Sequence, residues 1–346
     1  MFCGVIQMAD QPEQGKQGPL YGRAWKIVIY KKGEEGSGED TEMDVSLLRC
    51  IFKCQYTMGT ASTLGTLIVY NMNVRTEKET IEEGFQIRVE AGYEMGQYGE
   101  IFTGDIVQII RNRENGTDYR LEILAIRSVG VFDVNHVRAT IAANSTPRDV
   151  VETVAKQADT PIEVGEISEK LPDTPLPRGK VLFGKPSTYL RDICKWNNAW
   201  FSQNTDRKLE VHTLTDEIKD DQVLELTPNT GLVGTPKYTD QGINIRMLLD
   251  PRVKVTNSSG TLIKIDNEII QRQLISINSN PDQQGKSNQP DQKSQFDEDG
   301  EYMVISVTHS LDTYGDEWTT ECNALSRNGK AGLVTAMQNE KQNIRG

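Results

Sequence analysis

The sequence predicts a mainly β protein that carries a small α/β insert near its centre. Short apolar runs with period-two alternation recur on both sides of the centre, and Gly, Asn, Glu and Lys separate them. Only the central part contains two stretches with helical spacing of apolar residues. A chain of 346 residues is long enough for more than one such unit.

A first all-β unit is predicted for residues 21–130. In "FQIRVEAGY", Phe85, Ile87 and Val89 alternate with polar residues, which is the pattern of a strand with one buried face. Six such runs are expected to be strands, at residues 24–30, 49–56, 66–72, 85–93, 101–110 and 118–126. Short strands at this spacing are typical of a small barrel or sandwich.

The α/β insert is predicted for residues 131–216. In "NSTPRDVVETVAKQAD", Ser145 or Thr146 can cap a helix that has Pro147 in its first turn. A second helix is expected in "PSTYLRDICKWNNAWF", capped by Ser187, with its inner face made of Leu190, Ile193 and Cys194. The run "LEVHTL" then closes the insert as a strand.

A second all-β unit is predicted for residues 217–327, with strands in "VLELT", "GINIRMLL", "RVKVT", "TLIKI", "YMVISVTHS" and "EWTTECNAL". The polar stretch 278–300 has a single aromatic residue and is expected to be a long loop between two strands. Polar ends at residues 1–20 and 328–346 are expected to be flexible tails.

The charge excludes several classes of function. Lys and Arg number 38 against 50 Asp and Glu, a net charge of -12, so no overall positive field attracts nucleic acid or anionic lipid. No apolar run approaches the roughly 20 residues that span a bilayer. The first residues lack the basic and apolar regions of a secretory signal, so we expect synthesis and retention in a cytoplasm.

The five cysteines do not form a disulfide framework, because their number is odd and their spacing is irregular. Cys50 and Cys54 are four residues apart, a spacing that could hold a metal on a helix. In "RCIFKCQY", however, Cys50, Phe52, Cys54 and Tyr56 alternate with Arg49, Ile51, Lys53 and Gln55, which is strand periodicity with one face more apolar than the other. We therefore favour burial of both thiols in a strand over metal binding.

No motif for catalysis or cofactor binding is recognised. The glycines of "GTASTLG" lack the Lys-Ser/Thr of a phosphate loop, and the G-x-S-x-G and H-E-x-x-H patterns are missing from the sequence. The acidic clusters at 216–221 and 297–301 are interpreted as solvated turns. Hence no catalytic, cofactor-binding or metal-binding residue is predicted.

The stretch "GEYMVISVTHSLDTYGDEWTTECNAL" gathers a histidine and several acids at a turn, and it is predicted to be a structural hairpin. One face is expected to hold Met303, Ile305, Val307 and His309, and the facing strand Trp318, Thr320 and Cys322. His309 is expected at the strand edge with a backbone or turn carboxylate partner. Gly315 is expected to adopt a positive φ in the turn.

This hairpin resembles the closing hairpin of baseplate hub proteins from contractile phage tails, in particular the Mu-like hub and late control D families. The matching residues are Gly300, Tyr302, Val304, Val307, His309, Asp312, Gly315, Trp318 and Thr320. A second match lies in "GTPKYTDQGINIRMLLDPRVKVT", at Gly234, Pro236, Gly242, Leu248, Leu249 and Pro251. The two predicted helices resemble the family's insert, so the resemblance extends from about residue 20 to residue 327.

The resemblance implies two tail-tube-like β-barrels in one chain, and a homotrimeric ring that adapts a six-fold tail tube to a three-fold central spike. Its partners would be the tube protein or tube initiator, the spike and other baseplate proteins. DNA would only pass through the lumen of a virion component assembled in the host cytoplasm. Interface candidates are Gly234, Pro236, Gly242, His309, Asp312, Gly315, Asp316 and Trp318.

Two alternatives remain open from the sequence. One is another tail structural protein or a glycan-binding β-protein, which would need exposed aromatic residues. Against it, Trp25, Trp196, Trp200 and Trp318 fall in patterns that predict burial. The other is a tail-associated hydrolase, for which no additional segment of sufficient length is present.

Overall fold

The computed structural model describes most of the chain. The described residues are 20–31, 41–58, 63–73, 85–114, 116, 118–127, 132, 134–203, 208–213, 223–239, 242–255, 261–266 and 300–326. The predicted tails, apart from residue 20, and the predicted loop at 278–300, apart from Gly300, lie outside these ranges.

All six strands predicted for the first unit are present, and a short seventh strand joins them. The strands are β1 (Arg23–Lys31), β2 (Thr41–Asp44), β3 (Cys50–Thr57), β4 (Thr63–Tyr70), β5 (Gln86–Tyr93), β6 (Tyr98–Glu114) and β7 (Asp118–Arg127). The predicted alternation is confirmed, since Ile87 and Val89 of β5 are fully buried while Arg88 between them is exposed. Cys50 and Cys54 are both buried on β3, as expected.

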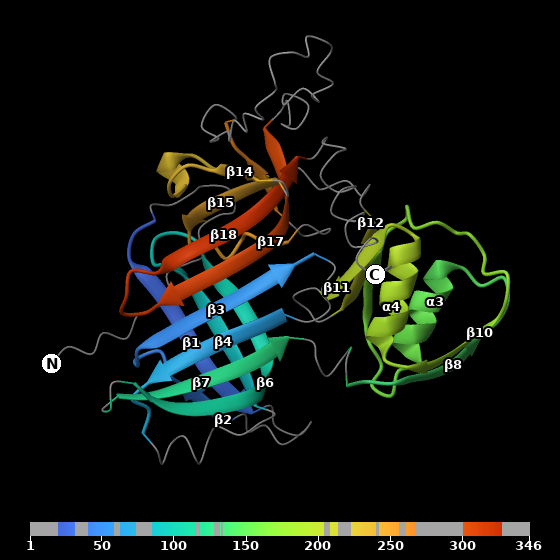
Figure 1. The fold of residues 1–346 in the computed structure, drawn as a ribbon, viewed down its shortest axis with the longest axis horizontal. Coiled ribbons are helices and arrows are strands. Elements are labelled where there is room, and N and C mark those ends of the chain that lie inside the picture. The colour runs from blue at the N-terminus through green and yellow to red at the C-terminus, as the bar shows by residue number, and fades with distance from the viewer. Residues whose placement is uncertain are drawn as a thin grey trace, which may run out of the picture.

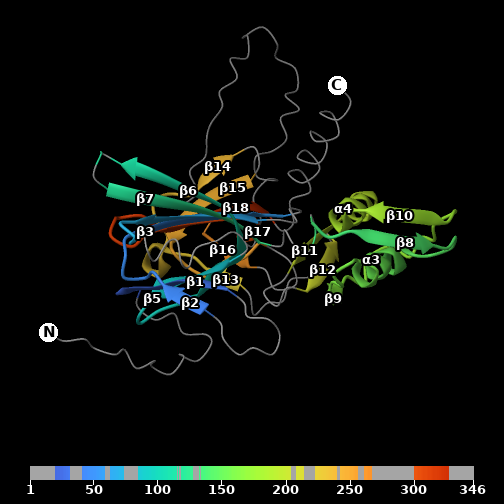
Figure 2. The same cartoon turned by 90° about the horizontal axis from the view of Figure 1, so that it is seen from below.

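Strand β6 turns the corner of this unit. Its first half, up to Asp105, pairs with β5, and the part from Asp105 onward pairs with β7, with an irregularity between Ile106 and Gln108. A bulge of this kind bends a strand and increases its twist. As a result β1, β2 and β5 lie across from β3 and β7 in two layers, as Figure 2 shows, and the apolar faces of both layers enclose one core.

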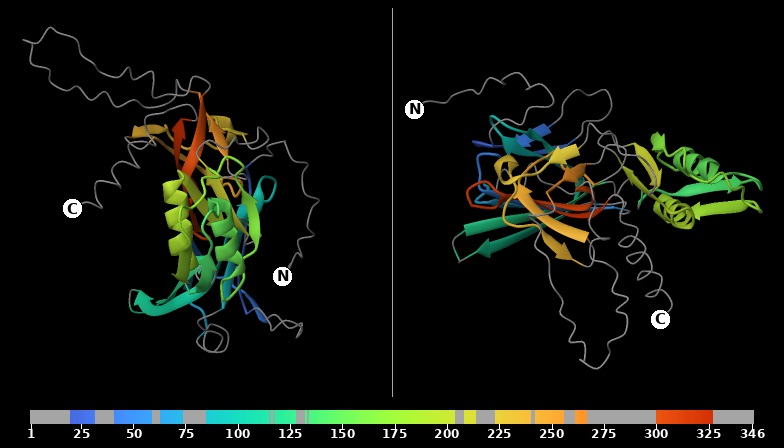
Figure 3. Two further views of the ribbon diagram at one scale, coloured as in Figure 1. Left: turned by 90° about the vertical axis from the view of Figure 1, so that its right-hand side faces the viewer. Right: turned by 90° about the horizontal axis from the view of Figure 1, so that it is seen from above.

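The insert is an α/β unit at one side of the β body (Figure 1, Figure 3). It contains β8 (Val137–Ile141), α3 (Pro147–Lys156), β9 (Val164–Ile167), β10 (Lys180–Gly184), α4 (Pro186–Trp196), β11 (Ala199–Gln203) and β12 (Leu209–Thr213). Strands β8 and β10 form a two-stranded sheet, and β11, β12 and β9 a three-stranded one. Helices and sheets share a core of their own.

Both helices form where the apolar spacing predicts them, but one cap differs. Thr146 caps α3 in a capping box with Asp149, as one of the two expected residues. The N-cap of α4 is Lys185 and not Ser187, because the helix already begins at Pro186, whose fixed φ suits the first helical position. The residues after Trp196 were expected to continue the helix, but Asn197 and Asn198 form a turn and β11 begins at Ala199.

Among the described residues, no helix has both the length and the apolar character needed to span a membrane.

The second β unit contains β13 (Val223–Glu225), a 3-10 turn η2 (Pro228–Thr230), β14 (Lys237–Thr239), β15 (Gly242–Leu248), β16 (Leu262–Lys264), β17 (Glu301–Asp312) and β18 (Trp318–Ser326). One predicted strand, "RVKVT" at residues 252–256, is wrong over its described part, because residues 251–255 form a turn and irregular backbone and residue 256 lies outside the described residues. There the side chain of Asp250 accepts a hydrogen bond from the Arg252 backbone N at 2.9 Å, an interaction that favours a turn over a strand.

The two β units belong to one hydrogen-bonded sheet. Its strand order is β14-β15-β18-β17-β3-β4-β7-β6-β5-β1-β2, with β16 also on β17 and β13 on β16. Along one edge, β17 pairs first with β16 at residues 301–303 and then with β3 at residues 306–312. The fold is therefore mainly β with an α/β insert, as predicted, and β17 is the strand that both units share.

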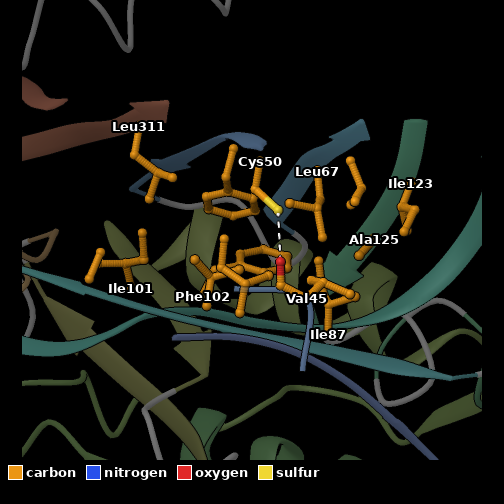
Figure 4. Packing of buried hydrophobic residues seen from close by; sticks show 14 of the residues in the cluster. Val45, Cys50, Leu67, Ile87, Ile101, Phe102, Ile123, Ala125 and Leu311 are labelled. Atoms are coloured by element: carbon orange, nitrogen blue, oxygen red, sulfur yellow. Dashed lines mark hydrogen bonds between the residues drawn. The ribbon is translucent and has the colours of Figure 1, made fainter. Parts of the chain in front are cut away.

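Phe102 lies at the centre of the first core (Figure 4). Its ring fills the space left by two glycines, because a Cβ atom at Gly65 or at Gly104 would lie 2.7 Å from the ring. Leu311 reaches the same core from β17 (Figure 4), and Trp318 and Leu249 of the second unit also belong to it. The first core is thus completed by residues from the far end of the chain.

Replacing Gly65 by alanine should lower the free energy of unfolding by about 1–3 kcal/mol, because the new methyl group overlaps the Phe102 ring. Urea unfolding of the purified chain measures the change. Gly99→Ala is the matched control, since a Cβ atom there would make an ordinary contact of 3.6 Å with Pro251. Equal losses of unfolding free energy in the two variants would contradict the proposal that the missing side chain of Gly65 makes room for the Phe102 ring.

Candidate functional site: the closing hairpin and its tip

The hairpin of β17 and β18 is the region that the sequence singled out, and a bulge shapes it. The register between the strands shifts between Val304 and Ser306. Tyr302 and Val304 therefore share a core with Val307, whereas Met303 packs in a small separate cluster. The prediction that Met303, Ile305, Val307 and His309 share one face is therefore wrong. The bulge inverts the alternation of buried and exposed side chains along β17. It could not be predicted, because an apolar run gives no local sign of an inserted residue.

The facing strand follows the prediction. Trp318, Thr320 and Cys322 are buried on one face of β18, with exposed fractions of 0–2%. Burial raises the pKa of the Cys322 thiol to about 12, and it raises the pKa of the Cys54 thiol on β3 to about 12 as well. Both thiols are therefore protonated and act as small apolar residues.

His309 is a buried neutral residue between two strands. It lies opposite Cys54 of β3 on one side and Thr320 of β18 on the other. Burial lowers the pKa of His309 to about 4, although the negative charge of Asp250 acts in the opposite direction. A group that stays unprotonated at neutral pH and has 3% exposure is poorly placed for acid-base catalysis.

The partner of His309 differs from the expected carboxylate or backbone group. Its Nδ1 atom lies 2.9 Å from the Thr320 hydroxyl. That hydroxyl accepts a hydrogen bond from the Asp250 backbone N at 3.1 Å, which leaves its proton available for Nδ1. The arrangement fits a neutral imidazole and ties β17 to β18 and to the turn after β15.

The hairpin tip is fastened to the start of β3. Arg49 Nη2 donates to Asp312 Oδ2 at 2.8 Å, and Tyr314 N donates to Asp312 Oδ1 at 3.0 Å. Two further hydrogen bonds join Thr313 to Cys50 in both directions, at 2.9 and 3.0 Å. Burial disfavours the charge on Asp312, but the hydrogen bonds from Arg49 and Tyr314 outweigh it and lower the pKa of this carboxyl.

Gly315 serves the turn in a different way from the one predicted. Its φ is not among the positive values, so positive φ does not explain the residue. A Cβ atom at this position would instead collide with Oδ2 of Asp312. The glycine is therefore needed for the close approach of the tip to the carboxylate that anchors it.

Strand β1 holds the other side of the tip. Arg23 donates to the carbonyl oxygens of Gly315 at 2.6 Å and Asp316 at 3.3 Å. The same guanidinium lies 5.4 Å from the centre of the Trp318 ring, and Trp25 meets that ring edge-on at 5.9 Å. The tip is thus held against the first unit by residues more than 250 positions away in the sequence.

The interface candidates fall into two groups at opposite ends of β18. His309, Asp312, Gly315, Asp316 and Trp318 come together at the hairpin tip and the strands next to it. Gly234, Pro236 and Gly242 lie at and before β15, which pairs with the other end of β18 near Ala324. Of the eight, Asp316 and Gly234 are exposed, whereas the side chains of His309, Asp312, Trp318 and Pro236 are buried within the chain.

Sequence reasoning missed the most exposed apolar side chains. At the tip these are Tyr314, 70% exposed, and Leu47, 91% exposed, whose carbonyl oxygen accepts from the Tyr314 hydroxyl at 3.4 Å. On the insert, Trp196 was expected to be buried and is 65% exposed, because α4 ends there. On β10, Val181 and Phe183 are also exposed. The sequence contained a signal for them, because in the strand "KVLFG" they alternate with the buried Leu182 and so must lie on the opposite face.

Comparison with known proteins agrees with this architecture. A sequence model of the family described as baseplate hub gp41 matches residues 63–268, more than half of the chain. The chain belongs to the baseplate hub gp41 family. No curated protein sequence matches it.

Two solved structures share the fold at low sequence identity. The 43 kDa tail protein of prophage MuSo2 from Shewanella oneidensis is 10% identical, with a TM-score of 0.54 over 88% of this chain and 98% of that one. A tail protein from Neisseria meningitidis MC58 is also 10% identical, with a TM-score of 0.52 over 90% and 99% of the two chains. The structural similarity covers a larger part of the chain than the family model does, because the family model matches only residues 63–268 and ends before the closing hairpin.

As a hub family member, the chain is a structural component of the phage tail baseplate and not an enzyme. The buried state of His309 and Asp312 is in accord with this assignment, because both are used to hold strands together. Among the described residues, no cluster of three or more His, Cys, Asp or Glu side chains could hold a metal ion.

Lowering the pH from 7 to 4.5 should destabilise the fold through His309. The unfolded chain takes up a proton near pH 6.5, whereas the folded chain does so only near pH 4, so stability is lost as the pH falls through this window. The expected loss from this residue is about 2–3 kcal/mol. Urea unfolding at pH 7, 5.5 and 4.5 measures it, with His309→Gln as the control in which this part of the slope disappears. Parallel slopes for both chains would refute the assignment.

Removing the charge of Asp312 should loosen the tip. Asp312→Asn keeps the shape of the side chain but removes the charged acceptor for Arg49, so the free energy of unfolding should fall by about 1–2 kcal/mol. Asp316→Asn, at an exposed position of the same turn, should change it by less than about 0.5 kcal/mol. Chemical unfolding of the two variants side by side measures the difference, and equal effects would argue against the anchor.

Proposed function

We propose that three copies of this chain form a ring in the baseplate that adapts the six-fold tail tube to the three-fold central spike. In this arrangement each chain supplies two tube-like β units, so that three chains offer six similar docking surfaces. One face of the ring binds the tube protein or tube initiator, and the other binds the spike and further baseplate proteins. DNA passes through the lumen without being bound.

The observation that carries this proposal is the shared strand β17. Because β17 pairs with β16 in one unit and with β3 in the other, the two units are joined by backbone hydrogen bonds. A symmetry adaptor needs such a junction, since two flexibly linked units could not hold fixed positions in a ring. The family assignment supports the same conclusion.

The net charge of -12 is in accord with passage of DNA. A negative lumen repels phosphates, so DNA would slide without adhering. Under this proposal the particle has a contractile tail and is assembled in the bacterial cytoplasm, in line with the resemblance of the closing hairpin. Neutralising acids that face the lumen should slow ejection of DNA.

Glycan binding by exposed aromatic residues is the alternative that the structure makes less favourable. Trp196 is exposed, but the Lys180 ammonium lies 5.2 Å from the centre of its ring. That ring face is therefore already engaged in a cation-π contact and is not open for a sugar to stack on.

The hairpin tip is the subunit interface that we propose within the ring. It is held in place by Arg23 and Arg49, and Tyr314 of the tip and Leu47 of the adjacent β2–β3 turn have most of their surface exposed. Exposed apolar side chains that are held in place mark interaction surfaces. The candidates Gly315 and Asp316 lie in the same turn, and the buried Asp312, His309 and Trp318 support it.

Negative-stain microscopy of the concentrated chain tests the proposal. Wild-type protein should form three-fold rings with a central hole, and Leu47→Ser/Tyr314→Ser should reduce the fraction of rings several-fold without changing the thermal midpoint, because both residues are exposed. Leu64→Ser, an exposed leucine on β4, is the control and should assemble normally. Compact single particles of the wild type would count against a ring formed by this chain alone.

A further inference from the structure

The outer face of the β8–β10 sheet carries an unusual apolar surface. Helices α3 and α4 belong to the same core as the inward-facing Leu182 and Val137. On the opposite face, Val181 is 70% and Phe183 76% exposed, although such positions in a sheet covered on one side are usually polar. An apolar face that is surrounded by charge indicates a contact with another macromolecule.

Basic residues surround this apolar surface. Arg138 pairs directly with Phe183 across the two strands, and the exposed Lys185 follows the end of β10. Between residues 178 and 195 there are five Lys or Arg and a single acid, Asp192, in a chain whose net charge is -12. We name Val181, Phe183, Arg138 and Lys185 the basic insert face; Lys180 is on the helix side of the strand, where its ammonium lies over the rings of Tyr189 and Trp196. Its charge selects an acidic partner.

An acidic counterpart exists on the same molecule, at the hairpin tip. There Tyr314 and Leu47 are exposed, and the exposed acids Asp316, Glu317 and Asp44 lie in the same turn or next to Leu47. The two arginines at the tip are engaged within the chain, Arg23 with the carbonyls of Gly315 and Asp316 and Arg49 with Asp312. We name Leu47, Tyr314, Asp44, Asp316 and Glu317 the acidic tip face.

The two faces lie at opposite ends of the molecule. The turn between β17 and β18 is at one end of the long axis and the insert is at the other (Figure 1). The view from above places them at opposite ends as well (Figure 3, right). One copy therefore cannot bring its own two faces together, whereas successive copies can do so head to tail.

We infer that the basic insert face of one copy binds the acidic tip face of the next copy. Each face has an apolar centre with charges of one sign around it, and the signs are opposite. A contact between two different faces is heterologous, and such a contact closes into a ring when the rotation between copies allows it. This inference rests on the proposed ring and specifies which surfaces join its subunits.

Reversing charges on each face tests the inference. Arg138→Glu/Lys185→Glu reverses the insert face, and Asp316→Lys/Glu317→Lys reverses the tip face. Each variant should weaken self-association of the full chain by about tenfold in sedimentation velocity runs. Lys156→Glu/Lys170→Glu, on exposed positions elsewhere in the insert, is the matched control and should associate like the wild type. Thermal unfolding verifies that all variants are folded.

Combining the reversals gives the decisive outcome. A chain with all four substitutions has both signs exchanged and should recover self-association and rings. A mixture of the two double variants should recover pairing between unlike chains, but alternation cannot close a ring of three. If both double variants associate like the wild type, the inferred contact is overturned. Three-fold rings of the wild-type chain would in that case still support the proposed ring, joined through other surfaces. A wild-type chain that stays monomeric at all concentrations would overturn this contact, whereas the hub assignment itself depends on the family match.

Discussion

The pairing of β17 with β3 is the interaction on which the rest of the structure depends. Without it the chain would consist of two β units connected through an α/β insert and loops. Seven residue pairs, from Ser306 to Asp312 on β17, join the units into one sheet. The ion pair of Arg49 with Asp312 and the bonds of Arg23 to the hairpin tip add to this junction from the side of the first unit.

The polar residues at the junction give the pairing a defined register. A shift of one residue would turn every side chain of β17 to the opposite face of the sheet. A shift between β17 and β3 would separate Asp312 from Arg49, and a shift between β17 and β18 would separate His309 from Thr320. Either residue would be left buried without its present partner. The residues that first suggest an active site therefore act as determinants of strand alignment, which explains why a histidine and an aspartate are placed so close to an apolar core.

Much of the local structure could be predicted from the sequence, and the long-range structure could not. Alternation located β5 and β7 because each buries one face, and Thr146 with Asp149 marked the start of α3 because capping depends on neighbours along the chain. The bulge at Ile305 was missed because an apolar run gives no sign of an inserted residue. Pairing between β3 and β17 joins residues some 250 positions apart, and no local pattern specifies such a partner.

The completion of the first core by the closing hairpin imposes an order on biosynthesis. Leu311 and Trp318 pack against residues of the first unit, so that unit lacks part of its interior until residues 301–326 have left the ribosome. During that time β3 has an unpaired edge on the side that β17 later occupies. The nascent chain must hold this edge apart from other polypeptides while the insert and the second unit are translated. The first unit thus reaches its final structure only when the closing hairpin pairs with β3, and not by folding independently of the residues that follow it.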